Sequence, residues 1–334
     1  GGIMRSQRGM ALLVVLLILT VMVVVAANIS TRFHMEMFRT SNLVRQQQAK
    51  WYAHGAEALV IKTLNQDLKD SPNRTHLGQY WATSGQSFPV DEGVIRGEIR
   101  DAQACFNVNG INSTSLPAGE TGLPYSAGVF KQLLINLQVE ESMAEQITDA
   151  LRDWVDSDDQ LVSGLGAEDA WYQSLKVPYL TGNGPMTDIS ELRLVRGVTP
   201  AIYRRLLPQI CALPSPPTGA ELKINVNTLR ESQAPLLAAL FLNQMGQDEA
   251  QNLLQERPKD GWPDTATFVS LPAVMAASSG LGDKLQKSVA VTSYYFEGRL
   301  QVEMDDLQVR FITLFKRQNS NKVTVIRRQY GGSE

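Results

Sequence analysis

An uninterrupted apolar segment near the N-terminus constrains this sequence more than any other feature. The 18 residues from Met10 to Ala27 contain no charge and a single hydroxyl, that of Thr20. A helix of this length spans ~27 Å at ~1.5 Å per residue, which is close to the hydrocarbon thickness of a bilayer. The segment therefore predicts a transmembrane helix rather than a helix of a soluble core.

The same helix is expected to continue well beyond the membrane. No glycine or proline occurs between Met10 and His54, and the helix should end at Asp70, just before Pro72 and Asn73. Its first third would be fully apolar and the remainder amphipathic. The apolar residues of the second part recur at spacings that indicate one helical stripe: Ile29, Phe33, Met37, Val44, Trp51, Leu59, Leu64 and Leu68.

A short basic leader precedes the apolar segment. Arg5 and Arg8 are followed by Gly9, and Met10 opens the run. This arrangement resembles the leader of type IV prepilins, which a prepilin peptidase cuts after the glycine, and residues 1–3 then read as extraneous. An ordinary secretory signal is the alternative, because residues 25–27 offer a small-residue cleavage site at the far end. In the prepilin interpretation the N-terminus is cytoplasmic and the bulk of the chain is periplasmic.

Composition favours an exported protein that does not bind nucleic acid. The chain has 334 residues, 43% of them hydrophobic, and a formal net charge of -3, so no basic field exists to hold a polyanion. The length suggests two domains. Cys105 and Cys211 are the two cysteines of the sequence, and an even number in an exported chain makes a disulfide the default, with two buried thiols as the alternative.

Strand-forming segments lie near both ends of the exported part. Residues rich in Val, Ile, Tyr and Phe occur at 93–102, 106–110, 288–296, 297–304, 307–316 and 322–328, with turns expected at Glu297-Gly298, Asp305-Asp306 and Asn319–Asn321. We predict an α+β fold in which the long helix and an antiparallel sheet form one domain from residues 28–111 and 288–330. The mostly helical residues 112–287 are too many for a sheet connection and should form an inserted all-α domain.

The predicted insert contains an internal repeat. Cys105-Phe-Asn-Val-Asn109 and Lys223-Ile-Asn-Val-Asn227 are near copies, each followed by an apolar helix. The unit resembles the helix-hairpin-helix modules of DNA-uptake proteins, which makes a membrane-anchored DNA-binding protein the alternative function. The hairpins at 136–140 and 243–247, however, lack the Gly-apolar-Gly sequence with which such modules hold a phosphate. A reused scaffold is therefore the favoured interpretation.

Seven carboxylates crowd into residues 149–169 with Arg152 among them: Asp149, Asp153, Asp156, Asp158, Asp159, Glu168 and Asp169. Hard oxygen ligands without His or Cys favour calcium over zinc or copper. The EF-hand spacing is not met, so the residues alone leave calcium and a solvated acidic loop equally open.

Several motifs together resemble general secretion pathway protein K, the family of large minor pseudopilins of type II secretion. They are Asp153-Trp-Val-Asp-Ser-Asp158, Gly166-Ala-Glu-Asp-Ala-Trp-Tyr172, residues 190–197 and residues 224–228. Val14 also stands where most pseudopilins carry a glutamate, and the lack of that glutamate marks this family. The resemblance implies the pseudopilin fold, a tip position in the pseudopilus, two smaller pseudopilins as partners, and processing and methylation by the prepilin peptidase at Gly9 and Met10.

The resemblance also implies that the helical insert binds one or two calcium ions. We expect the ligands to be Asp156, Asp158, Glu168 and Asp169, with Asp153 and Asp159 in reserve. No enzymatic activity is expected, since the three histidines lie on or just after the long helix and none accompanies a Cys or Ser nucleophile motif. We expect a single-pass inner-membrane protein. The sequence leaves open whether the pseudopilus tip contacts exported substrate or the outer-membrane channel.

Overall fold

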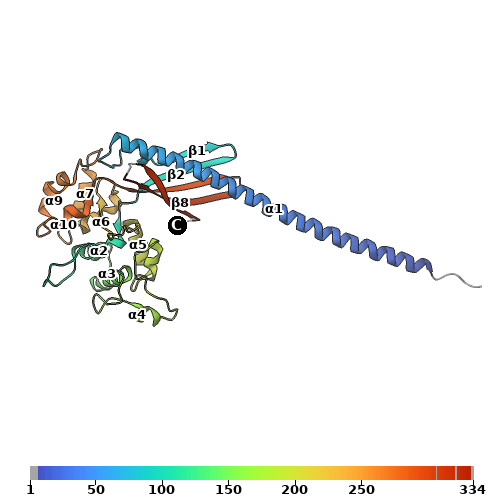
Figure 1. Ribbon diagram of the computed structural model, residues 1–334, viewed down its shortest axis with the longest axis horizontal. Helices are drawn as coiled ribbons and strands as arrows, with labels where there is room; N and C mark the ends of the chain where they lie inside the picture. The colour runs from blue at the N-terminus through green and yellow to red at the C-terminus, as the bar shows by residue number, and fades with distance from the viewer. Residues whose placement is uncertain (1–6, 306, 320–321, 332–334) are drawn as a thin grey trace, which may run out of the picture.

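Figure 1 shows the computed structural model, which describes residues 7–305, 307–319 and 322–331. One long helix, α1 (Gln7–Asp70), projects far beyond a body made of a sheet and a helical unit. Among the described residues it is the helix long and apolar enough to cross a membrane, with a mean hydropathy of 3.2 in its most apolar window. The predicted unbroken helix is confirmed, including its end at Asp70. Residues 1–6 of the expected leader lie outside the described residues.

The C-terminal part of α1 lies on an antiparallel sheet with strand order β1-β2-β7-β8-β9. The first two strands are β1 (Gln86–Val90) and β2 (Gly93–Asp101), after which the chain leaves the sheet. It returns as β7 (Tyr295–Met304), followed by β8 (Leu307–Arg317) and β9 (Val323–Tyr330). The predicted α+β architecture, a long helix on an antiparallel sheet with a helical insertion between its strands, is confirmed.

Two details of the predicted sheet are wrong. Glu297 and Gly298 do not form a turn but lie inside β7, paired with Leu314 and Thr313 of β8. Gly298 is there because the ring of Phe315 fills the space above it, where a Cβ would come within 2.8 Å of the ring. The segment expected as a strand from 288 to 296 also does not join the sheet as a whole, since only its end belongs to β7. The expected turns at 305–306 and 319–321 fall partly on residues outside the described ones.

Small side chains form the face of α1 that packs on the sheet. The buried residues are Ala49, Ala53, Ala56, Val60 and Leu64, which pack with Ile95, Phe296, Leu300, Val302, Phe311 and Phe315. The alanines let the helix approach the strands, and the sheet supplies the large side chains that fill the core. Of the predicted stripe, Leu64 packs in this core, whereas Trp51 is 77% and Leu59 is 47% exposed, so the stripe as a whole is not the buried face.

An ion pair with a buried carboxylate fixes α1 against β9, the strand at the edge of the sheet opposite β1. The Oε1 atom of Glu57 accepts hydrogen bonds from Arg328 Nε at 2.7 Å and from Thr313 Oγ1 at 2.8 Å. Burial opposes ionisation of Glu57, but these hydrogen bonds outweigh it and lower the pKa below its ordinary value. In the pairing of β8 with β9, a register shift between Leu314 and Phe315 leaves Ile326 of β9 without a paired residue on β8. Because removing one partner would strand a buried charge, the pair selects one position of the helix on the sheet.

The helical unit has a separate hydrophobic core. Its buried residues run from Phe106 to Val291. We had expected Phe106, Val108 and Ile111 in the sheet domain, but the structure places them in this core. The first half contains β3 (Phe106–Asn107), α2 (Tyr125–Asn136), α3 (Glu141–Val155), α4 (Asp169–Gln173), α5 (Pro200–Leu206) and β4 (Ile210–Cys211). The second contains β5 (Ile224–Asn225), α6 (Ala234–Ala239), α7 (Gln247–Gln255), α8 (Thr265–Val269), α9 (Pro272–Ala276), α10 (Lys284–Ser288) and β6 (Val289–Ala290). Four short 3-10 helices belong to the described part of this unit: η2 (Val108–Gly110), η3 (Ile189–Leu194), η4 (Leu207–Gln209) and η5 (Glu231–Gln233). A further one, η1 (Tyr80–Ala82), lies between α1 and β1 and packs in the core of the sheet domain.

The second asparagine of each Asn-Val-Asn motif holds a distant loop. The side chain of Asn109 accepts a hydrogen bond from Met186 N at 2.7 Å and donates to Met186 O at 3.0 Å. Asn227 makes the same pair of bonds to Trp262, at 2.7 and 2.9 Å. The motif is therefore a structural clamp that closes each half of the helical unit.

Each half also begins and ends with strands that pair in parallel. Asn107 of β3 lies opposite Cys211 of β4, and Asn225 of β5 lies opposite Ala290 of β6. In the first half Cys105 and Cys211 form a disulfide, with Cα atoms 5.8 Å apart. The corresponding positions of the second half are Lys223 and Ala290, so the second half lacks the bridge.

This symmetry predicts that Lys223→Cys combined with Ala290→Cys forms a second disulfide. Because the bridge would restrict the unfolded chain, it should raise the free energy of unfolding by up to about 4 kcal/mol in the loop-entropy model. Alkylation without reduction followed by mass spectrometry would detect it, with Lys223→Cys alone as the control. Two alkylated thiols in a folded double variant would contradict the proposed symmetry.

Candidate metal centre

The acidic cluster lies where α3 ends. The apolar side of this helix, which includes Ile147, Leu151 and Trp154, packs into the helical core. The loop that follows folds back and brings Glu168 to the last turn of α3. One carboxylate oxygen from each of Asp153, Asp156 and Glu168 lies within 4.8 Å of the others. The structure thus brings Glu168 beside two carboxylates that stand 15 and 12 residues before it in the sequence.

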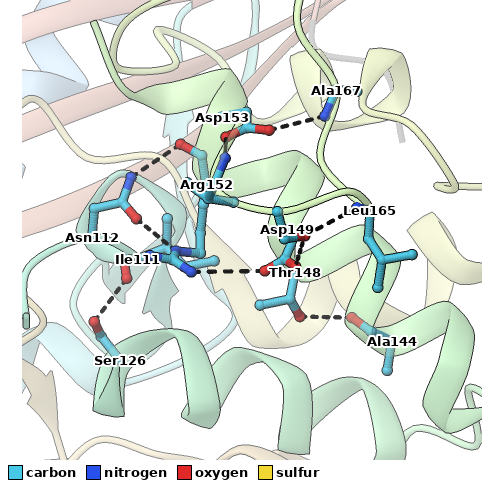
Figure 2. A network of polar contacts seen from close by, with 12 residues as sticks. Ile111, Asn112, Ser126, Ala144, Thr148, Asp149, Arg152, Asp153, Leu165 and Ala167 are labelled. Carbon is cyan, nitrogen blue, oxygen red and sulfur yellow. Dashed lines mark hydrogen bonds and ion pairs between the residues drawn. The ribbon is translucent and has the colours of Figure 1, made fainter. Parts of the chain in front are cut away.

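Asp153 is fully buried and ties the loop to α3 (Figure 2). Its Oδ1 atom accepts a hydrogen bond from Val162 N and its Oδ2 atom accepts one from Ala167 N, both at 2.9 Å. Gly166 makes this approach possible, since a Cβ there would lie 1.9 Å from Asp153 Oδ2. Asp153 therefore shapes the loop as well as contributing a carboxylate to the cluster.

Asp156 and Glu168 carry buried oxygen atoms that lack a hydrogen-bond partner among the described residues. These atoms are Asp156 Oδ1 and both Oε atoms of Glu168, a side chain that is only 6% exposed. Burial, reinforced by the negative charges of Asp153 and Asp156, raises the pKa of Glu168 to about 8. Burial likewise raises the pKa of Asp153 and of Asp156 to about 6. Unpaired buried carboxylates this close together fit a hard divalent cation.

The remaining predicted ligands lie elsewhere in the loop and hold its turns. Asp158 Oδ1 accepts a hydrogen bond from Gln160 N at 2.8 Å, and Asp169 Oδ1 accepts one from Thr181 N at 2.9 Å. Asp159 accepts a hydrogen bond from Asn183 Nδ2 at 2.9 Å. Of the four expected ligands, the structure therefore groups Asp156 and Glu168, and the reserve residue Asp153 completes the cluster.

Asp149 belongs to a neighbouring polar network rather than to the cluster. Arg152 Nη1 lies 3.7 Å from Asp149 Oδ1, and Ser163 donates a hydrogen bond to Asp149 Oδ2 at 2.6 Å. Figure 2 shows that Arg152 also reaches Asn112, which connects the end of α3 to the start of the helical unit.

Aromatic side chains form a rigid support beneath the cluster. Trp154 and Tyr172 are buried and meet edge to face with ring centroids 5.2 Å apart. Tyr179 stacks on Tyr172 at 5.3 Å. Gly182 lies so close to the Trp154 indole that a Cβ would come within 2.5 Å of its Nε1 atom. Trp154 and Tyr172 are therefore core anchors of the loop.

Comparison with known protein families shows to which family the chain belongs. Two family profiles, both described as type II secretion system (T2SS), protein K, match residues 104–215 and residues 224–292. The chain belongs to the type II secretion system protein K family. The two matched ranges coincide with the two halves of the helical unit.

Individual relatives agree with this assignment over the whole chain. Type II secretion system protein K of Aeromonas hydrophila is 47% identical over 336 residues, with 99% of each chain covered. The protein of that name from Pectobacterium carotovorum subsp. carotovorum is 46% identical, with 98% of each chain covered. The family resemblance predicted from the sequence is confirmed.

A solved structure shares the fold. One chain of the crystal structure described as the GspK-GspI-GspJ complex from the enterotoxigenic Escherichia coli type 2 secretion system superposes with a TM-score of 0.79. That chain is 34% identical, and the match covers 88% of this chain and all of the other. These comparisons give no support to the alternative of a DNA-uptake protein. At the two hairpins the positive-φ positions are Gln138 and Leu242, where a phosphate-binding hairpin would need glycine.

Glu168→Gln should stabilise the ion-free protein at pH 8 by about 1–3 kcal/mol and have little effect at pH 5. The pKa of Glu168 is raised on folding, so the folded state holds a proton that the unfolded state releases. The stability of the wild type therefore falls as the pH rises from 5 to 8. Urea unfolding of residues 28–334, stripped of metal, measures the difference, with exposed Glu249→Gln as the control. Equal stability changes at both pH values would contradict the buried environment of Glu168.

Proposed function

We propose that the protein is a structural, non-enzymatic minor pseudopilin at the tip of the type II secretion pseudopilus. The observation that carries this proposal is α1, which combines a membrane-spanning segment with the helix that supports the sheet. The helical unit lies at the end of the sheet away from the N-terminal part of α1 (Figure 1). A unit of this bulk fits the end of a helical fibre better than its interior. There it would face exported protein or the outer-membrane channel.

The anchoring and processing of the chain follow from the same helix. Residues 10–27 would hold the protein in the inner membrane, with the bulk of the chain in the periplasm. Cleavage between Gly9 and Met10 by the prepilin peptidase, followed by methylation of the new N-terminus, would leave this span on the mature chain. Val14 supports the tip position, because the glutamate usual there would pair with a subunit stacked ahead.

The membrane-proximal part of α1 is the proposed contact with two other minor pseudopilins. Phe33, Met37 and Val44 are exposed on one face of the helix, near the turns at Glu92 and Asp305 that end the sheet. An apolar face of this kind needs a partner in water. The solved relative is named as a complex of three proteins, which supports two partners here.

Phe33→Glu combined with Met37→Glu should reduce recovery of the two partner subunits about tenfold or more, because charges would enter an apolar helix interface. Co-purification of the full-length chain from membranes measures this loss. Asn42→Glu, on the opposite face of the helix, should leave recovery unchanged. Normal recovery with the double variant would contradict the proposed assembly.

We also infer that the cluster of Asp153, Asp156 and Glu168 binds calcium. The three side chains offer hard oxygen donors, and the unpartnered buried atoms of Asp156 and Glu168 leave them available to an ion. A bound calcium ion would offset the mutual repulsion of the carboxylates and favour their deprotonated forms. Asp158, Asp159 and Asp169 are the nearby carboxylates for any second ion.

Calcium at a hundredfold excess over Kd should stabilise the folded protein by about 2.7 kcal/mol, because it binds the folded state alone. Thermal unfolding of metal-stripped protein should show a higher melting temperature in calcium than in chelator, with magnesium a poor substitute. Asp156→Asn combined with Glu168→Gln should abolish the response, whereas Asp248→Asn, at an exposed carboxylate outside the acidic loop, should retain it. Identical melting curves of the wild type in calcium and in chelator would contradict a calcium site and leave a solvated acidic loop.

A further inference from the structure

One peptide plane of the acidic loop is held from both of its sides. Its N–H group, on Ala167, donates a hydrogen bond to Asp153 Oδ2 at 2.9 Å (Figure 2). Its C=O group, on Gly166, accepts a hydrogen bond from Arg196 Nη1 at 3.1 Å. Because the C=O and N–H groups of a trans peptide point in opposite directions, the two contacts together fix the rotation of the plane. The next residue is Glu168, so this rotation decides where the third carboxylate of the cluster lies.

The guanidinium of Arg196 is itself held by residues of α3 and α4. With the amide of Gln146 oriented so that its oxygen faces Arg196, this oxygen accepts hydrogen bonds from Nε and Nη2, both at 3.1 Å. The guanidinium also lies over the ring of Trp171, 5.0 Å from the ring centroid. The backbone N–H of Arg196 donates to the hydroxyl of buried Tyr172 at 3.2 Å. Arg196 therefore has one defined position beside the loop.

These groups form a row along one face of α3. Gln146 and Asp153 are seven residues apart, which places them two turns apart on the same face of a helix. Arg196 and the Gly166 peptide connect the two side chains, Arg196 on the Gln146 side and the peptide on the Asp153 side. Because the row begins and ends on one helix, it sets the distance between α3 and the loop.

Arg196 contributes the direction of its donors rather than its charge. Its side-chain contacts are with a backbone carbonyl, an amide and an aromatic ring, and none of these groups is ionised. A lysine in its place would keep the positive charge. It could not hold Gly166 and Gln146 in two fixed directions, however, because its donors share one nitrogen whereas a guanidinium has a planar fork.

We propose that Arg196 is a positioning residue for the calcium site. It sets the rotation of the Gly166 peptide and, through that peptide, the placement of Asp153 Oδ2 and of Glu168 around the ion. The inference rests on the calcium site proposed above and adds that a residue outside the acidic loop determines its affinity. Removing a group that orients metal ligands without touching the metal typically weakens binding by about 10–100-fold.

Calcium titration by calorimetry, on the full-length chain in detergent after removal of metal, measures this effect. Arg196→Gln and Arg196→Lys should each raise the Kd for calcium about tenfold or more, because both lose the fork that holds the peptide. Arg193→Gln is the matched control, since Arg193 stacks over Tyr203 instead, and it should keep the wild-type Kd. A wild-type Kd in Arg196→Lys would overturn the proposal, because charge alone would then be sufficient.

Hydrogen exchange of the metal-free full-length chain separates positioning from general stability. In Arg196→Gln the amide of Ala167 should exchange about tenfold faster, because the peptide can then rotate away from Asp153. The amide of Val162, which donates to the other oxygen of Asp153, should keep its rate. Mass spectrometry with fragmentation to single residues reads both amides. Faster exchange at both, together with a lower melting temperature, would mean that Arg196 only stabilises the fold and would overturn the proposal.

Gln146→Leu tests the same row from its other end and remains informative where Arg196→Gln does not fold. It leaves Arg196 in place without its anchor, so the Kd for calcium should rise several-fold. Adding Gln146→Leu to Arg196→Gln should raise the Kd no further, because the two residues act through one peptide. A wild type that binds no calcium would overturn both the calcium site and this inference. Calcium binding by the wild type with an unchanged Kd in these variants would overturn this inference alone.

Discussion

The structure depends on one helix meeting two different environments without a break. The first third of α1 is apolar on all sides, whereas its last third must bury one face on the sheet and keep the others in water or against a partner. Alanines at 49, 53 and 56 reconcile these demands, because they bring the helix close to strands that carry Phe296, Phe311 and Phe315. The pair of Glu57 and Arg328 then fixes the position that this packing alone would leave adjustable.

A second buried carboxylate joins the sheet to the helical unit. Asp101 stands where the chain leaves β2, and its Oδ2 atom accepts hydrogen bonds from Asn225 at 3.0 Å, Thr228 at 2.7 Å and Ser293 at 2.5 Å. Burial raises the pKa of Asp101, and these donors act against that rise. Because Asn225 is the first asparagine of the repeated motif, the same motif builds the helical unit and attaches it to the sheet.

A further contact lies at the opposite edge of the sheet. Gln329 of β9 donates a hydrogen bond to Asp188 Oδ2 at 2.7 Å, and Arg327 donates one to the backbone oxygen of Thr187. The residue next to Arg327 is Arg328, which turns instead toward Glu57 on α1. One strand therefore holds the helix on one side and the helical unit on the other, which gives the acidic loop a fixed place relative to the membrane anchor.

The sequence predicted the elements with strong periodicity and missed features that depend on tertiary packing. The unbroken α1 and the main antiparallel strands followed from apolar patterning. The predicted stripe included Trp51 and Leu59, which are exposed, and left out the alanines of the buried face, because patterning detects large apolar residues and undervalues a row of alanines. Gly298 was read as a turn, although it serves to make room for Phe315. Within the acidic loop, sequence could not separate Glu168 from Asp169, since adjacent carboxylates point to different sides only once the loop has folded around Asp153.

Retention of residues 10–27 on the mature protein is what lets α1 serve as both anchor and sheet support. N-terminal sequencing of the protein extracted from membranes of a strain with active prepilin peptidase tests it most directly. We expect the mature chain to begin at Met10. A mature chain beginning at Asn28 would contradict it, because the membrane span would then have been removed as an ordinary secretory signal.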